Sequence, residues 1–231
     1  MTLKGYFIAL EGIDGSGTST QANLLVDYLS KKGPKAHLTC EPSSGSIGQL
    51  LRKVLRGELK MDPATVALLF AADRVDHVRS EIQPKLEKRI HVVTDRYVYS
   101  SLTYQSIDQN LDWVSQINSL APEPDLTIYL RLDPRIAAER MSSRSQEQEI
   151  YETIEQQSQV AENYDTILGS SPNEGSWRVV PPGSRGVQVD PSQIHVTSAR
   201  KPKVAIIDGG QSISEIQFLI PDLVDKSCPI P

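Results

Sequence analysis

Short apolar runs alternate along this chain with longer segments whose apolar residues recur at helical spacing. Five runs have the length and composition of buried strands: residues 6–12, 35–40, 90–97, 125–133 and 203–209. The segments between them place apolar residues three and four positions apart, as amphipathic helices do. Helices are predicted over residues 19–33, 46–57, 62–89, 98–106, 110–120, 148–168 and 212–220, with another starting at Pro134. The pattern predicts an α/β fold, a five-stranded parallel sheet with helices on both faces.

One segment departs from this alternation. Residues 169–202 are rich in Gly, Ser and Pro, with only short strand-like runs at 187–189 and 194–196. A loop of this length is unusual inside a compact domain, so we expect a small hairpin appendage or a partly mobile insertion. Residues 1–231 otherwise form a single domain in this interpretation.

Charge and composition exclude some function classes. A net charge of −5 argues against a general nucleic-acid binder, which needs a basic surface. No apolar stretch approaches the roughly 20 residues that span a bilayer, and the first apolar run leaves no room for a signal peptide. Cys40 and Cys228 lie far apart and form no metal-binding spacing. A cytoplasmic protein is expected.

The stretch EGIDGSGTST, residues 11–20, nearly matches the phosphate-binding pattern G-x-x-x-x-G-K-[ST]. Backbone N–H groups of such a loop, together with the positive end of the following helix, bind phosphate. The alternative is a glycine turn that only joins a strand to a helix. The candidate phosphate-binding residues are Gly12, Asp14, Gly15, Ser16, Gly17, Thr18, Ser19 and Thr20.

Thr18 stands where the pattern has lysine. Losing one charge-stabilising donor costs roughly 10²–10³ in rate where this has been tested. Either another cation fills the space, or catalysis is slow, or catalysis has been lost.

Asp95 and Arg96 follow the third predicted strand. An Asp at this place can hold magnesium, and an arginine can grip a phosphate through two hydrogen bonds. Such a pair is also common as a surface ion pair. Because parallel strands end at one edge of the sheet, Asp95 and Arg96 are expected beside the phosphate loop.

Several ordered segments resemble thymidylate kinases, nucleoside-monophosphate kinases of the P-loop class. They are FIALEGIDGSGTSTQ, EPSSGSIGQLLR, LLFAADRVDHV through IQPKL, VVTDRYVYSSLTYQ, PDLTIYLRLDP and the tail PKVAIIDGGQSISEI. The resemblance implies a three-layer fold with a lid at approximately 140–150. It also implies Mg²⁺-dependent transfer of the ATP γ-phosphoryl group to dTMP, giving dTDP. A homodimer through the helices near 46–80 is typical of the family.

The resemblance also implies roles near the phosphates. Ser19 and Asp95 correspond to the metal side, and Arg96 to the clamp on the acceptor phosphate. Asp14 corresponds to the contact with the sugar 3′-hydroxyl, and Glu41 to a position near the acceptor phosphate and the metal.

Other matching positions imply a thymine pocket. Phe70 would stack on the base, Arg74 would hydrogen-bond it, and Ser101 would face its edge. Tyr104 would fill the space of a ribose 2′-hydroxyl, with Gln105 supporting that wall. Each has an ordinary structural alternative: Phe70 as core, Arg74 paired with Asp73 or Asp76, and Tyr104 as a buried aromatic. Tyr164 resembles a tyrosine that helps to cover the nucleoside.

Family members carry catalytic arginines either on the lid or in the phosphate loop. The loop interior here, IDGS, has no basic residue, so Arg140 and Arg144 of the lid are the candidates. Residues four apart share a helix face, so we expect Arg140 against adenine and Arg144 against the phosphates. The alternative is a solvated helix end. Thr18, Cys40 and Ala161 replace basic residues that are usual or frequent in the family. Substitute cations for the missing lysine are Arg52, Arg144 and Arg185.

Two other functions remain open. A related deoxynucleoside kinase would need a base near a 5′-hydroxyl rather than a phosphate clamp, so Asp14 and Arg96 favour the monophosphate kinase. A non-catalytic nucleotide-binding protein would explain Thr18, but not the retained Ser19 and Asp95.

Overall fold

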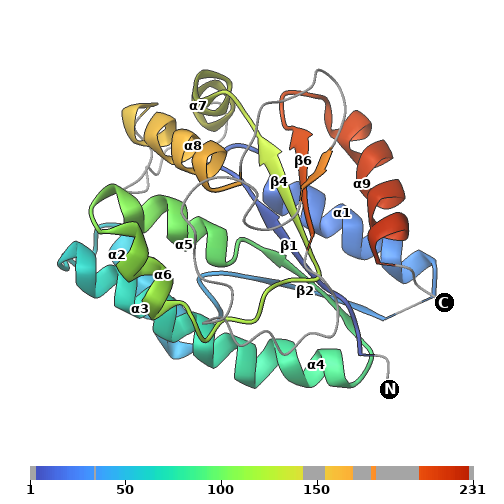
Figure 1. Cartoon of the computed structure of the whole chain (residues 1–231), viewed down its shortest axis with the longest axis horizontal. Helices are drawn as coiled ribbons and strands as arrows, with labels where there is room; N and C mark the ends of the chain where they lie inside the picture. Colours follow the sequence, from blue (N-terminus) through green and yellow to red (C-terminus); the bar gives the residue numbers. More distant parts are fainter. Residues whose placement is uncertain (1–3, 34, 143–153, 169–177, 181–202, 229–231) are drawn as a thin grey trace.

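The computed structural model describes residues 4–33, 35–142, 154–168, 178–180 and 203–228. A sheet crosses the molecule between layers of helices, with α1 and α9 side by side on one face (Figure 1). The strands are β1 Phe7–Glu11, β2 Ala36–Cys40, β3 His91–Asp95, β4 Leu126–Arg131, β5 Arg178–Val180 and β6 Lys203–Asp208. The helices are α1 Thr18–Lys31, α2 Ser46–Leu55, α3 Pro63–His77, α4 Gln83–Glu87, α5 Val98–Tyr104, α6 Leu111–Ile117, α7 Pro134–Ser142, α8 Ile154–Leu168 and α9 Ile213–Ser227.

The strand order is β2-β3-β1-β4-β6-β5. The five predicted strands pair in parallel, which confirms the α/β fold. The short β5 joins β6 antiparallel and lies within the segment expected to be an appendage. A strand of three residues at the edge of a sheet is too short to show a recognisable pattern of apolar and polar residues in the sequence. The strand-like runs at 187–189 and 194–196 lie outside the described residues.

Alternate residues of β1 face opposite layers of the fold. Ile8 and Leu10 pack in one cluster with side chains of α1 and α9. Phe7 and Ala9 pack in another, with the π-helical turn Val78–Ile82. All of β1 is buried, as expected for a central strand covered on both faces.

Two predicted helices differ from those observed in more than the exact position of their ends. The segment 62–89 forms α3, the π-helical turn and α4 in succession, and begins as predicted, with the Asp62 side chain capping Ala64 N–H at 2.9 Å. The last helix was expected to end before Pro221, but α9 continues to Ser227. Leu223 and Val224 extend its buried face, so packing outweighs the proline.

The loops that carry the candidate residues leave the sheet at one edge. Strand β3 lies between β2 and β1, and the register pairs Asp95 with Cys40 on one side and Leu10 on the other. The segments after Glu11, Cys40 and Asp95 therefore start side by side, where ligands bind in parallel sheets.

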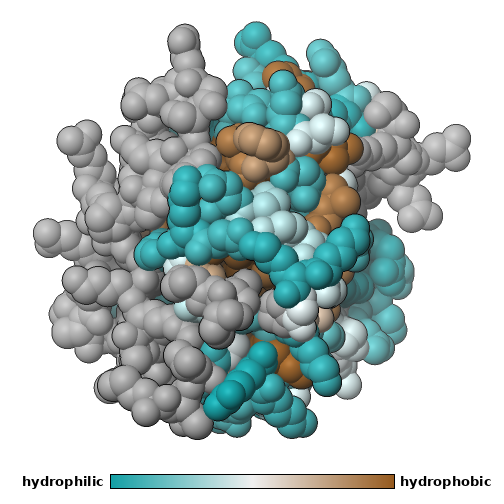
Figure 2. Space-filling view, turned by 90° about the vertical axis from the view of Figure 1, so that its right-hand side faces the viewer, coloured by the Kyte–Doolittle hydropathy of each residue, from teal (hydrophilic) through white to brown (hydrophobic). Residues whose placement is uncertain are grey.

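In the view of Figure 2, hydrophilic residues cover most of the described surface, and apolar residues form separate patches. Among the described residues, no helix combines the length and hydrophobicity that crossing a bilayer requires.

Candidate functional site

The phosphate loop joins β1 to α1 and depends on its glycines. A Cβ on Gly12 would lie 2.4 Å from Ser16 Oγ and 2.9 Å from the Leu130 carbonyl oxygen. Gly15 and Gly17 have φ of +82° and +94°, in the left-handed region that glycine favours. Gly17 precedes α1 as its N-cap and has no side chain to cap the helix, which leaves the helix start open to an anion.

Ser19 and Asp95 lie in contact at the open end of this loop. Ser19 Oγ donates to Asp95 Oδ2, while Asp95 Oδ1 is buried and has no hydrogen-bond partner among the described residues. A partnerless carboxylate oxygen beside a hydroxyl fits Mg²⁺, which binds few protein oxygens and keeps several waters or phosphate oxygens. The described part of the chain contains no cluster of three or more His, Cys, Asp or Glu suited to a metal.

Thr18 is buried as the first residue of α1. Of the three substitute cations, Arg144 and Arg185 lie outside the described residues. Arg52 donates to the carbonyl oxygens of Pro42 at 2.5 Å and Ser43 at 3.2 Å. Arg52 is thus held by the loop after β2.

Arg96 contacts the phosphate loop directly. It donates to the Gly12 carbonyl oxygen at 2.8 Å, to Asp14 Oδ1 at 2.6 Å and to Ser100 Oγ at 3.1 Å. Its guanidinium lies 5.2 Å from the centre of the Tyr104 ring. Burial alone would lower the pKa of Arg96, but Tyr104 and Asp14 raise it well above the ordinary value. Arg96 therefore remains charged and is fixed beside the loop.

Arg74 and Glu41 form a buried ion pair. Arg74 Nη2 lies 2.7 Å from Glu41 Oε2, and Nη2 also donates to the Tyr97 carbonyl oxygen at 3.0 Å. Asp73, one of the two partners considered from sequence, instead accepts hydrogen bonds from Ser43. A buried guanidinium needs a carboxylate close by, and Glu41 supplies it from the end of β2.

Glu41 lines the same cavity as Asp95 and Arg96, and its carboxylate is held by α3. Its Oε1 lies 3.2 Å from His77 Nδ1, so both carboxylate oxygens have partners on α3. The carboxylate that lies beside Ser19 is Asp95.

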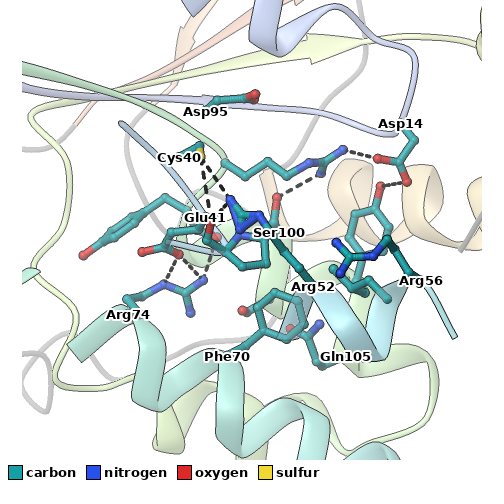
Figure 3. Close-up of a pocket in the computed structure, with 16 residues that line it drawn as sticks. Asp14, Cys40, Glu41, Arg52, Arg56, Phe70, Arg74, Asp95, Ser100 and Gln105 are labelled. Carbon is teal, nitrogen blue, oxygen red and sulfur yellow. Dashed lines mark hydrogen bonds and ion pairs between the residues drawn. The ribbon is translucent and has the colours of Figure 1, made fainter. Parts of the chain in front are cut away.

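A cavity of about 380 Å³ collects the acceptor-side candidates. Figure 3 shows Asp14, Glu41, Phe70, Arg74 and Gln105 around it. Its lining residues are Asp14, Cys40, Glu41, Pro42, Arg52, Leu55, Arg56, Phe70, Arg74, Asp95, Arg96, Tyr97, Ser100, Ser101, Tyr104 and Gln105. The volume is that of a small-molecule site.

Ser101 and Gln105 line this cavity, and each has a polar atom without a hydrogen-bond partner in the described part of the chain. Ser101 Oγ and Gln105 Oε1 are buried without a hydrogen-bond partner among the described residues. Buried polar atoms are normally paired, so an unpaired one in a residue of a cavity wall is a candidate contact for a polar ligand. Phe70 is only partly buried at this wall, and a full core role does not describe it.

Sequence reasoning missed Glu11, the last residue of β1. Its carboxylate accepts hydrogen bonds from Tyr97 N–H at 3.0 Å, Tyr99 N–H at 3.1 Å and Ser100 Oγ at 2.6 Å. Burial raises its pKa, with Ser100 and Tyr164 opposing the shift. Glu11 ties the segment after β3 to the start of the phosphate loop.

Tyr164 lies elsewhere than the resemblance implied. Its ring stacks on Tyr129 with centroids 4.7 Å apart, and its hydroxyl donates to Glu11 Oε2 at 2.9 Å. It is fully buried and does not line the cavity. Tyr164 is therefore a core residue that supports the site.

Arg140 lies against the loop between β6 and α9. It donates to the carbonyl oxygens of Gly209 at 2.9 Å and Gly210 at 3.4 Å. Arg144, its expected companion, lies outside the described residues, as do most of the approximate lid 140–150 and most of the segment 169–202.

Most of the chain is similar to known thymidylate kinases. A family model described as thymidylate kinase matches residues 10–176. A probable thymidylate kinase of Pyrococcus horikoshii is 43% identical over 168 residues, covering 70% of this chain and 82% of the relative. One from Methanococcus vannielii is 48% identical over 163 residues, covering 70% and 77%.

A solved structure of thymidylate kinase from Candida albicans supports the fold. It superposes with a TM-score of 0.71 at 24% identity and covers 96% of this chain and 92% of that one. The family match spans well over half of the chain, and the two relatives share more than 40% identity with it. This chain belongs to the thymidylate kinase family.

Proposed function

We propose that this chain is an enzyme that transfers the γ-phosphoryl group of ATP to dTMP, giving ADP and dTDP. The observation that carries the proposal is that the phosphate loop and the cavity lie next to each other at one edge of the sheet. The cavity, whose wall includes the unpaired oxygen atoms of Ser101 and Gln105, adjoins the phosphate loop through Asp14 and Arg96. A nucleotide acceptor and a triphosphate donor can therefore meet at the loop.

On the acceptor side, each group has a defined task. Arg96 holds the phosphate of dTMP through two N–H donors. Phe70 stacks on thymine, and Arg74 hydrogen-bonds the base from its fixed position on Glu41. Asp14 accepts a hydrogen bond from the sugar 3′-hydroxyl.

The remaining wall selects the base and the sugar. Ser101 and Gln105 offer their unpaired oxygen atoms to the base edge. Tyr104, whose hydroxyl donates to Asp14 Oδ2 at 3.0 Å, fills the space of a ribose 2′-hydroxyl.

On the donor side, the loop from Gly12 to Thr20 cradles the ATP phosphates with backbone N–H groups. Ser19 and Asp95 would hold Mg²⁺. When bound, the ion neutralises phosphate charge. Arg140 lies against adenine, and Arg144 supplies the positive charge that Thr18 lacks.

The protein aligns the two substrates and forms no covalent intermediate with them. An oxygen of the dTMP phosphate attacks the γ-phosphorus of ATP, and the bond from that phosphorus to the bridging oxygen of ADP breaks. Arg96 meanwhile keeps the attacking phosphate in place. Exclusion of water prevents hydrolysis of ATP.

Two other functions fit less well. A deoxynucleoside kinase has no acceptor phosphate, so the charged and only partly exposed Arg96 would lack the ligand that this proposal gives it. A non-catalytic nucleotide binder has no use for the Ser19–Asp95 contact.

Incubation with γ-³²P-labelled ATP and dTMP, followed by chromatography, tests the proposal. Labelled dTDP is expected, whereas label only in inorganic phosphate or ATP would contradict it.

The proposal extends to the organisation of the protein. We infer a single P-loop kinase domain over residues 1–231, with a lid at approximately 140–150 and an insertion at approximately 169–202. The protein acts in the cytoplasm as a homodimer formed through the helices near 46–80. Its partners are ATP and dTMP, without nucleic acid or membrane.

A further inference from the structure

Gln157 of α8 forms a reciprocal pair of hydrogen bonds with Asp14 of the phosphate loop. The Asp14 N–H donates to Gln157 Oε1 at 3.1 Å, and Gln157 Nε2 donates to Asp14 Oδ2 at 2.9 Å. A backbone N–H can only donate, so it must face the amide oxygen. The amide nitrogen is thereby directed at the carboxylate.

Gln157 occupies a position where an apolar residue would be ordinary. The buried face of α8 consists of Gln157, Val160, Tyr164 and Leu168, and Gln157 is fully buried. Placing an amide there costs free energy unless its polar atoms are paired. Pairing with Asp14 offsets that cost and links α8 to the phosphate loop.

A second contact holds the same helix face to the site. Tyr164, two turns after Gln157, donates to Glu11 Oε2 and lies 3.0 Å from Ser100 Oγ. Glu11 immediately precedes the phosphate loop, and Ser100 accepts from Arg96. Helix α8 is therefore anchored both at the start of the loop and within it.

The hydrogen bonds of Asp14 define which part of its carboxylate is free. Oδ1 accepts from Arg96, and Oδ2 accepts from Tyr104 and Gln157. A carboxylate has about four acceptor positions, so these three bonds leave about one. They also fix the plane of the carboxylate, and hence the direction in which the remaining lone pair points.

We infer that Gln157 is a positioning residue for recognition of the acceptor sugar. It holds the Asp14 carboxylate so that its remaining lone pair meets the 3′-hydroxyl of the nucleotide. The inference rests on the proposed function for the role of Asp14 and adds a residue outside the cavity lining. Gln157 of α8 then contributes to the preference for nucleotides that have a 3′-hydroxyl over those that lack it.

The test compares two acceptors in binding, which does not require turnover. Calorimetric titration measures the Kd of dTMP and of 3′-deoxy-dTMP for wild type, Gln157→Leu and Gln159→Leu. Gln159 is exposed on the same helix and is the matched control. Gln157→Leu should weaken dTMP about tenfold, as expected for loss of a hydrogen bond to a charged group, and 3′-deoxy-dTMP far less. The preference for the 3′-hydroxyl should shrink accordingly, while Gln159→Leu leaves it unchanged.

A purely structural role for Gln157 gives a different result. Equal weakening of both nucleotides would overturn the inference, as would unchanged binding of both. If the leucine variant unfolds, Gln157→Met, which preserves side-chain length, is measured with the same expectation. A wild type that binds both nucleotides equally would overturn the role of Asp14 and the inference with it. Binding without phosphoryl transfer would reject the kinase proposal alone.

Discussion

Ser19 and Asp95 are in hydrogen-bond contact although 76 positions separate them in the chain. The contact exists because β1 and β3 are parallel neighbours, so the loop after one strand reaches the end of the other. Each residue alone is weak support for a metal site. Together, with the second Asp95 oxygen unpaired among the described residues, they carry the proposal of a Mg²⁺ site made above.

This contact predicts the effect of Asp95→Asn. Removing the charge should lower kcat by roughly 10²–10³, comparable to losing one preorganised electrostatic group. The Mg²⁺ concentration for half-maximal activity should rise, while the Kd of dTMP changes little. Steady-state kinetics over a Mg²⁺ series checks this, with Asp27→Asn on the exposed face of α1 as the control. An unchanged Mg²⁺ dependence would argue against the metal role of Asp95.

The Glu41–Arg74 pair predicts a large loss of stability. Both side chains are almost fully buried, so Glu41→Ala leaves an uncompensated guanidinium. Breaking a buried pair in this way costs about 3–5 kcal/mol of unfolding free energy. Urea unfolding measures the loss. Glu58→Gln, which disrupts the exposed pair with Arg56, is the control and should barely change stability.

Glu11 predicts a pH dependence of stability. Burial raises the pKa of its carboxyl above the ordinary 4.5, so ionisation costs more in the folded than in the unfolded protein. The contribution of Glu11 to stability should therefore fall as pH rises from about 4.5 through the folded pKa. The difference in unfolding free energy between wild type and Glu11→Gln isolates this effect. As pH rises, the variant should become more stable relative to wild type. The opposite trend would contradict a raised pKa of Glu11 in the folded protein.

The proposed role of Arg144 predicts that its replacement affects turnover but not dTMP binding. If Arg144 replaces the charge of the missing lysine, Arg144→Ala should abolish measurable turnover and leave the Kd of dTMP nearly intact. Arg135→Ala, an exposed arginine of α7, is the control. Unchanged turnover in Arg144→Ala would remove Arg144 from the mechanism.

The sequence predicted the central architecture because its strands are buried on both faces. Runs such as YFIAL are apolar throughout, and a parallel sheet produces that pattern. The cap at Asp62 was equally readable, since it depends only on neighbouring residues. The short β5 was not, because its pairing with β6 depends on a distant partner.

The cavity residues were predictable for a different reason. Asp14, Phe70, Arg74 and Gln105 lie in motifs, and the structure brings them to one cavity. Their partners were not predictable, since the pairing of Arg74 with Glu41 is a tertiary contact across 33 positions. The Gln157–Asp14 pair spans 143 positions and gives no local signal in the chain.

The measurement that tests the central claim most directly is ADP release from Mg²⁺ and ATP with different acceptors. Parallel reactions would contain dTMP, dUMP, thymidine or no acceptor, each with a titration of nucleotide binding. The account predicts ADP release that depends on dTMP, with little release from thymidine or without acceptor. Binding of dTMP without any acceptor-dependent ADP release would contradict it, because a chain with Thr18 would then bind nucleotides without performing the transfer.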